Sequence, residues 1–459
     1  MASSELPGNA GDHWEEDGAV RELLADREGL APYERSPFEL LDLQLRAVSE
    51  QLEQRRTSIP VLGQRASDAG ISKPASLQDV APLLLPHQAY KSYPQSFVDN
   101  ARWDRMNQWY STLSALDHEA VDFTGATDVD GWIACMSAAG RGMYTTSGTT
   151  GKAGFLPASD RDRARNRDIA AASIRQVFAT AGAKMPMFVL GARGGPQKLS
   201  DFNEVFVDLL AEPGGDHFLF EQIDPVAMTN RLGAIRTASN NGTVRPEDLA
   251  DVQRMQLAKR DEFERNMARM ADLVVAHIDR PILLKAFWSQ MLQFIDLLRQ
   301  RGVQPGSLAP GSIVFAGGGK KADSLPDDFV QQVEAFFTGV DFVVYYSMSE
   351  ILHLSYPCSA GRQHLPAAVV PVLLDESGER AIEPVEGVVQ GRMGLFELAL
   401  RDRWGGVISS DWVTADYGRC PCGLPSFSLI EIGRISQGSD DKLTCAGTID
   451  AYVRDIVGA

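Results

Sequence analysis

The sequence lacks any apolar run long enough to cross a bilayer, for which a helix needs about 18 or more residues. Its N-terminal stretch, MASSELPGNAGDHWEEDGAV, is acidic and polar and contains no apolar signal segment. These two absences predict a cytoplasmic protein that has no membrane partner.

Basic residues are in deficit. The chain has 44 Lys and Arg against 61 Asp and Glu, which gives a formal net charge of −17. A protein with no basic stripe cannot neutralise many phosphates, so nucleic acid and anionic lipid are excluded as expected partners. A nucleotide would have to be held by local loops against this acidic field.

Cysteine is scarce, with five in 459 residues. So few thiols in so long a chain do not form a disulfide framework, and in a reducing compartment they are buried, metal-binding or reactive. Apolar residues make up 44% and charged residues 23%, as in ordinary globular enzymes.

Apolar strand-like runs alternate with helical patterns along the chain, which predicts an α/β fold with parallel-rich sheets flanked by helices, plus a small β subdomain. The expected strands are residues 185–192, 217–223, 312–321 and 341–350, and the expected helices include 37–53 and much of 244–300. The predicted organisation is a disordered leader at 1–18, an α/β core at 19–365, a β subdomain at 366–445 and a tail at 446–459.

The strongest local motif is the run Thr146-Ser147-Gly148-Thr149-Thr150-Gly151-Lys152. Glycines let backbone N–H groups turn towards a phosphate, hydroxyls add donors, and the lysine adds positive charge. The run differs from the P-loop NTPase motif, because Thr146 stands where that motif has Gly and Ala153 where it has Ser or Thr. It therefore predicts a phosphate-binding loop of another kind.

This run resembles the phosphate loop of the adenylate-forming superfamily, which includes acyl-CoA ligases, luciferases and the adenylation domains of peptide synthetases. Further motifs follow in the order of that superfamily. Residues 317–319 are a triple glycine after an apolar strand, and residues 346–350 (YSMSE) resemble Tyr-Gly-x-Thr-Glu, with Ser347 for Gly and Ser349 for Thr. Residues 414–416 (TAD) resemble Thr-Gly-Asp, and Gly433-Arg434 follows.

The resemblance implies ATP and Mg²⁺ as ligands. It assigns nucleotide binding to Thr146, Ser147, Gly148, Thr149, Thr150, Gly151, Gly317, Gly318, Gly319, Tyr346, Ser349, Asp416 and Arg434. In this assignment the Tyr346 ring stacks on adenine, Asp416 binds the ribose hydroxyls, and Arg434 approaches the ribose or phosphates. Glu350 holds Mg²⁺ and, with Lys152, acts in catalysis.

The sequence is more similar to the phenylacetate–CoA ligases and the acyl-protein synthetase of bacterial luminescence. The likeness rests on GGGKK (317–321), YPCSAGRQHLP (356–366) and ADYGRCPCGLPSFSLIEIGR (415–434). It implies that an aryl or fatty acid is converted to an acyl-adenylate with release of pyrophosphate. The acyl group then passes to a thiol of CoA, an acyl-carrier protein or a protein cysteine. Transfer to an amine, or a degenerate protein that only binds nucleotide, are the alternatives.

Members of the superfamily carry a mobile C-terminal lid with a catalytic lysine, whereas this chain ends at Ala459, soon after Arg434. The expectation is that the lid is absent. The charge that develops on the phosphates would then be neutralised by a lysine of a partner or by one of this chain, namely Lys152, Lys320, Lys321 or Lys442.

Cys358, His364, Cys420 and Cys422 offer three thiolates and one imidazole, a set suited to tetrahedral structural zinc. The alternative is a pair of buried cysteines and an exposed turn. Zinc here would fasten the 358–364 loop to the segment just after Asp416.

Three further expectations concern the acyl group. Cys445 lies where the resembling acyl-protein synthetase carries its acyl-accepting cysteine; it is otherwise a small apolar residue of a terminal strand. His353 either orients an acyl carbonyl or caps a turn. Four aromatic residues either indicate a pocket for an apolar or aromatic acid or are ordinary core residues, namely Phe287, Trp288, Phe294 and Phe315.

Overall fold

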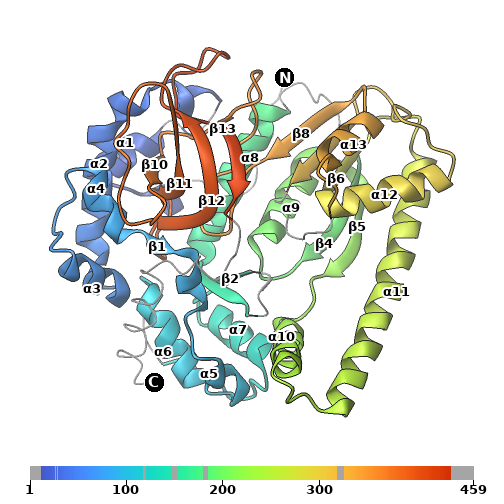
Figure 1. The fold of residues 1–459 in the computed structure, drawn as a ribbon, viewed down its shortest axis with the longest axis horizontal. Coiled ribbons are helices and arrows are strands. Elements are labelled where there is room, and N and C mark those ends of the chain that lie inside the picture. Colours follow the sequence, from blue (N-terminus) through green and yellow to red (C-terminus); the bar gives the residue numbers. More distant parts are fainter. Residues whose placement is uncertain are drawn as a thin grey trace.

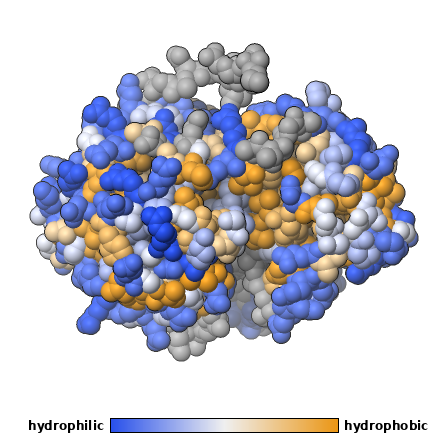
Figure 2. Space-filling model, turned by 90° about the horizontal axis from the view of Figure 1, so that it is seen from above, coloured by the Kyte–Doolittle hydropathy of each residue, from blue (hydrophilic) through white to orange (hydrophobic). Residues whose placement is uncertain are grey.

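The computed structural model describes residues 12–25, 27, 29–116, 120–146, 152–178, 184–317 and 325–435. Two large sheets lie side by side, each with helices packed against it (Figure 1). Seen from above, a furrow runs down the middle of the molecule, with hydrophobic residues along its right side and polar residues over the outer rims (Figure 2).

The first large sheet has five strands in the order β5-β4-β6-β7-β8, and all of its neighbouring strands are parallel. Its strands are β4 (Met185–Gly194), β5 (Ala211–Gln222), β6 (Leu283–Phe287), β7 (Ile313–Gly317) and β8 (Asp341–Tyr345). The predicted α/β class is confirmed by this sheet and the helices around it.

Both faces of the parallel sheet are buried. Along β7, Ile313 and Phe315 face one hydrophobic core while Val314 faces the other, because successive side chains of a strand point to opposite faces. The helices α8 (Asp160–Val177) and α9 (Lys198–Leu210) cover the Phe315 face. The Val314 face is covered by α11 (Pro246–Ala276), α12 (Trp288–Gln300) and α13 (Phe329–Phe336).

The second large sheet is mostly antiparallel and follows the order β10-β11-β12-β13-β9, with β1 parallel to β12. Its strands are β1 (Leu85–Pro86), β9 (Gln363–His364), β10 (Val369–Leu374), β11 (Val388–Glu397), β12 (Gly406–Asp416) and β13 (Ser428–Arg434). Because β1 and β9 precede residue 366, this sheet includes strands from both sides of the predicted domain boundary.

The N-terminal third is mainly helical and packs against the second sheet. It contains α1 (Gly18–Ala25), α2 (Pro37–Arg55), α3 (Pro60–Asp68), α4 (Leu77–Val80), α5 (Gln95–Asp99), α6 (Trp103–Leu113) and α7 (Val129–Ala138), with the 3-10 turns η1 (Asp12–Trp14), η2 (Ala31–Tyr33), η3 (Ala81–Leu83) and η4 (His87–Lys91). A capping box between Ser36 and Glu39 begins α2, which confirms the helix predicted from residue 37.

The helical patterns predicted within 244–300 are confirmed by α11 and α12. The buried strand β6 lies between these helices, and the sequence analysis did not predict it because a short apolar run cannot be told from a helix by periodicity. A further helix, α10 (Val226–Asn240), precedes α11. No helix among the described residues is long and apolar enough to span a membrane.

The prediction that residues 1–18 form a disordered leader is wrong for residues 12–18. The Trp14 ring lies 4.9 Å from the Arg165 guanidinium, and Glu16 forms a 2.7 Å ion pair with Arg165 and a 2.8 Å pair with Arg401. The acidic segment is ordered because its charges meet these arginines, which lie far away in the sequence. Residues 1–11 are outside the described part of the chain.

The N-terminal anchor can be tested at Glu16, whose side chain is 3% exposed while that of Arg165 is fully buried. Glu16→Ala leaves this buried guanidinium without its carboxylate, so we expect the free energy of unfolding in urea to fall by about 3 kcal/mol. The neighbouring Glu15 is exposed, and Glu15→Ala is the matched control. Equal stability of the two variants would contradict the anchor.

Candidate active site

The motif at 146–152 begins on one strand of an antiparallel pair and ends just before the other strand. Strand β2 (Met143–Thr146) pairs with β3 (Gly154–Pro157), and the Gly154 N–H donates a 3.1 Å hydrogen bond to the Thr146 hydroxyl. The structure therefore fixes both ends of the loop. Ser147, Gly148, Thr149, Thr150 and Gly151 are outside the described residues, and their phosphate role stays a prediction.

Lys152 stands at the base of this loop. Its ammonium donates to the Tyr93 carbonyl and lies 4.1 Å from the centroid of the Tyr93 ring. The Tyr93 hydroxyl in turn donates to the Ala153 carbonyl at 2.9 Å. Tyr93 thus holds Lys152 beside the hairpin, and its predicted catalytic role is untested.

A second lysine, Lys91, lies at the same place. A Cβ atom on Gly154 would come within 3.3 Å of the Lys91 side chain, so this side chain passes directly over the start of β3. The positive charge of Lys91 also acts to lower the pKa of Glu350. The sequence analysis missed Lys91 because it belongs to no motif and precedes the loop by more than 50 residues.

The segment 346–350 directly follows β8, and a buried lysine holds it. Lys198, the first residue of α9, donates to the Ser347 hydroxyl at 3.0 Å, to the Met348 carbonyl at 3.2 Å and to the Ile351 carbonyl at 2.6 Å. Burial lowers the pKa of Lys198 to about 7, although the nearby carboxylates Glu397 and Glu350 oppose this shift.

A buried arginine connects the same segment to the hairpin. Arg403 is fully buried, and its guanidinium donates to the Pro157 carbonyl at 2.6 Å. It also donates to the carbonyls of Ser349 and Glu350, both at 3.2 Å. The end of β3 and the segment that carries Glu350 are therefore neighbours, although nearly 200 residues separate them in the chain.

Glu350 is a half-buried residue whose carboxylate lies near three positive charges. Burial raises its pKa, while Arg403, Lys91 and Lys198 act to lower it. Mg²⁺ is commonly held by one or two carboxylates together with the phosphates of a nucleotide. The single carboxylate of Glu350 fits this arrangement.

Tyr346 and Arg434 meet at a residue that the sequence analysis missed. The Tyr346 hydroxyl donates to Asp411 Oδ2 at 3.0 Å, and Arg434 Nε lies 3.5 Å from Asp411 Oδ1. In the sheet, Asp411 of β12 is directly opposite Arg434 of β13. The structure thus brings these two predicted nucleotide-binding residues together.

Asp416 does not join them. It ends β12 five residues after Asp411, roughly 16 Å along an extended strand. Its Oδ2 forms a 2.6 Å ion pair with Arg362, and its Oδ1 accepts the Gly418 N–H at 2.8 Å. Binding of a ribose by Asp416 would therefore have to displace or share the Arg362 guanidinium.

Gly317, the last residue of β7, is covered by an aromatic ring. A Cβ atom there would come within 2.0 Å of the Tyr345 ring, so only glycine allows this ring to pack. The face of Gly317 expected beside adenine is thus filled by Tyr345. Gly318 and Gly319 are outside the described residues, as are Lys320, Lys321, Lys442 and Cys445.

The predicted acid pocket is not formed by the four aromatic residues named for it. Trp288 and Phe294 pack in the core on one face of the parallel sheet, whereas Phe315 packs on the other face. Phe287 is 36% exposed. The sheet separates these side chains, so they serve as ordinary core and surface residues.

The predicted metal ligands do come together. The ligand atoms of Cys358, His364, Cys420 and Cys422 all lie within 4.8 Å of one another. The sulfurs of Cys358 and Cys420 are 3.8 Å apart, and Cys422 Sγ lies 3.4 Å from His364 Nε2. With Zn–S bonds of about 2.3 Å, a tetrahedral site has sulfurs about 3.8 Å apart, so the cluster fits zinc.

The surroundings of His364 also suit a metal. Its Nδ1 hydrogen-bonds the Ser426 hydroxyl at 2.8 Å, which leaves Nε2 directed at the thiols. Burial lowers the pKa of His364, which favours the neutral imidazole that binds metals.

The residues that sequence reasoning missed contact partners that lie far from them in the sequence. Lys91, Lys198, Arg362, Arg403 and Asp411 each contact the site through partners that no local pattern reveals. A buried cation flanked by ordinary residues gives no periodicity or spacing to detect.

No family model matches the chain, and no curated protein matches it. Among solved structures, it is similar to the inhibitor-bound N-terminal domain of FACL13 from Mycobacterium tuberculosis, with 13% sequence identity and a TM-score of 0.32. The similarity covers 64% of this chain and 60% of that one, so the chain spans less than two thirds of its length. A likeness this distant assigns no function, which has to be inferred from the geometry of the site.

Removal of the Lys198 ammonium tests how the 346–351 segment is held. Lys198→Met leaves one hydroxyl and two carbonyls without their donor, so we expect the free energy of unfolding to fall by about 3 kcal/mol. Amide hydrogen exchange should also accelerate within 346–351. The exposed Lys184, whose ammonium donates to the Asp208 carbonyl, gives the control Lys184→Met. Unchanged exchange in Lys198→Met would refute the clamp.

The metal cluster predicts that the purified chain retains about one equivalent of zinc, measured by plasma mass spectrometry. Cys422→Ser should lose the metal and lower the melting temperature, because the 358–364 loop then loses its link to 420–422. Cys135→Ser, on the distant helix α7, should leave both unchanged. A zinc-free wild type with the same melting temperature as Cys422→Ser would count against the site.

Proposed function

We propose that this protein uses ATP to convert a carboxylic acid to an acyl-adenylate, releasing pyrophosphate, and then transfers the acyl group to a thiol. The observation that carries the proposal is the junction at Arg403. This one side chain binds both the end of the hairpin with the phosphate-loop motif and the segment with Glu350.

We infer that three kinds of group face a nucleotide beside this junction. Backbone N–H groups and hydroxyls of the loop are suited to phosphate oxygens, and Lys91 and Lys152 add positive charge at the base of the hairpin. Tyr346 and Arg434 meet a few residues from Glu350. This combination fits a nucleoside triphosphate. Lys91 and Lys152 would neutralise the charge of its phosphates, and the Tyr346 ring would contact its base.

Adenylation needs positioning more than covalent chemistry. The carboxylate of the acid attacks the α-phosphorus, a P–O bond to the acid forms, and pyrophosphate leaves with the electrons of the broken P–O bond. Mg²⁺ held by Glu350 would supply charge neutralisation at the phosphates. Lys91 and Lys152 stabilise the charge that develops on them, a role that requires no lysine from a lid.

We also propose that zinc at Cys358, His364, Cys420 and Cys422 is structural. Its four ligands leave no open position for a substrate, as is typical of structural zinc. The bound metal would fix Arg362, which lies between two of the ligands in the chain and pairs with Asp416.

ATP–pyrophosphate exchange tests the adenylation step directly. We expect exchange with at least one acid of a panel of benzoate, phenylacetate, octanoate and tetradecanoate. Glu350→Gln should reduce that exchange about 10²- to 10³-fold, the range found when one stabilising group is lost. Glu264→Gln, on the exposed face of α11, is the control. A chain that exchanges with no acid of the panel would disprove adenylation and favour a degenerate nucleotide-binding protein.

The thiol acceptor is tested in the same preparation. Labelled acid should yield a hydroxylamine-sensitive thioester on CoA, on a carrier protein or on the chain itself. Loss of labelling of the chain in Cys445→Ala would identify that cysteine as the acceptor.

A further inference from the structure

A buried histidine and glutamate form a pair beside the Glu350 segment. His353 Nδ1 lies 2.7 Å from Glu397 Oε2, and the Glu397 side chain is fully buried. The same carboxylate accepts the N–H groups of Leu352 and His353 at Oε2 and of Ala399 at Oε1, each at 3.1 Å. The pair is thus fixed by the backbone on both sides.

These contacts determine which imidazole nitrogen can act as a base. Burial alone would raise the pKa of Glu397, but His353 and the backbone N–H groups outweigh it and lower that pKa, so the carboxylate is charged. A carboxylate can only accept, so Nδ1 carries a proton towards Glu397, and whenever the imidazole is neutral its lone pair is on Nε2. Nε2 forms no hydrogen bond with any residue in the described part of the chain.

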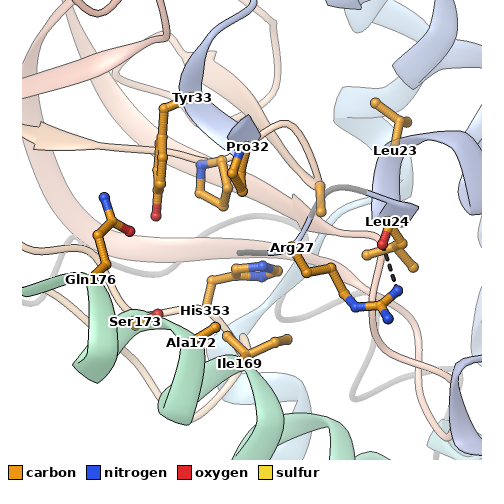
Figure 3. Close-up of a pocket in the computed structure, with 12 residues that line it drawn as sticks. Leu23, Leu24, Arg27, Pro32, Tyr33, Ile169, Ala172, Ser173, Gln176 and His353 are labelled. Atoms are coloured by element: carbon orange, nitrogen blue, oxygen red, sulfur yellow. Dashed lines mark hydrogen bonds between the residues drawn. The ribbon is translucent and has the colours of Figure 1, made fainter. Parts of the chain in front are cut away.

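His353 lines a small cavity (Figure 3). The cavity lies between the N-terminal segment, with Leu23 and Tyr33, and helix α8, with Ile169 and Ser173. It measures about 20 Å³, enough for about one water-sized group. Arg27 also lines it, and its guanidinium donates to the Leu24 carbonyl at 2.6 Å.

One wall of the cavity belongs to the chain segment that follows Glu350. His353 follows Glu350 by three residues, so their α-carbons are at most roughly 11 Å apart. Lys198 interacts electrostatically with both carboxylates, since the negative charges of Glu350 and Glu397 each act to raise its pKa. For the imidazole to act on an acyl-adenylate, the acyl end would have to extend from Glu350 towards His353.

We propose that His353 is the general base of acyl transfer and that the cavity receives the reacting end of the acceptor, a small protic group such as –SH or –NH₂. The assignment rests on the proposed adenylation. The size of the cavity favours such a terminal group over the body of a carboxylic acid.

Acyl transfer needs no group other than the acyl-adenylate, the acceptor and His353. The sulfur or nitrogen lone pair of the acceptor attacks the acyl carbon, and the acceptor proton moves to His353 Nε2. The bond between the acyl carbon and the AMP oxygen breaks, and AMP leaves with its electron pair. Glu397 is a positioning residue, because it keeps the proton on Nδ1 and stabilises the imidazolium.

The two half-reactions separate this role from adenylation. His353→Asn keeps an amide N–H that can donate to Glu397 but removes the base. With the acid of the panel that exchanges best, we expect ATP–pyrophosphate exchange within about threefold of wild type. Single-turnover decay of the bound adenylate with CoA, or in a parallel series with ethylamine, should slow about 10²- to 10⁴-fold in at least one series. The series that slows identifies the acceptor as thiol or amine.

Two further variants distinguish catalysis from packing. His353→Ala opens space for an imidazole, so added imidazole should restore part of the transfer rate, which a packing role would not allow. His277→Asn, on a histidine at the end of α11, is the matched control. Wild-type transfer rates in His353→Asn with both acceptors would overturn the proposal alone, whereas absence of exchange in the wild type would overturn the proposed adenylation with it.

Discussion

Two buried cations hold the segment on which the candidate site depends. Lys198 and Arg403 together donate to every backbone carbonyl from 348 to 351. This segment lies beyond the end of β8, and within the described part of the chain no strand pairs with these carbonyls. A buried carbonyl without a donor costs free energy. The cations therefore replace the hydrogen bonds that a sheet would provide.

Burial of two positive charges is unfavourable unless negative charge lies nearby. Glu350 and Glu397 provide it, and each acts to raise the pKa of Lys198. Because Glu397 also binds His353, one charge cluster connects the carboxylate proposed for Mg²⁺ with the imidazole beside the cavity. A change of charge at Glu350 would therefore change the electrostatic potential at His353, and the reverse, since the protein interior screens charge poorly.

The sequence predicted those parts that local patterns encode. Helix α2 begins with a capping box, β7 is a short apolar run before glycines, and the four metal ligands have recognisable types and spacing. The partners of Arg403 and Lys198 could not be predicted, because each contact joins segments 50 to 250 residues apart. The choice between a pocket and ordinary core for the aromatic residues could not be made from the sequence, because composition does not reveal the face of a strand.

The Arg362–Asp416 pair shows why the site has to be considered with the metal cluster. Arg362 lies between Cys358 and His364 in the chain, and Asp416 lies just before Cys420, so the ion pair and the four ligands connect the same two segments. A metal would hold these segments at fixed separation and thereby keep the guanidinium on the carboxylate. Any ligand that needs Asp416 must then compete with a charged partner whose position the cluster sets, so the cost of binding there depends on the cluster as much as on Asp416 itself.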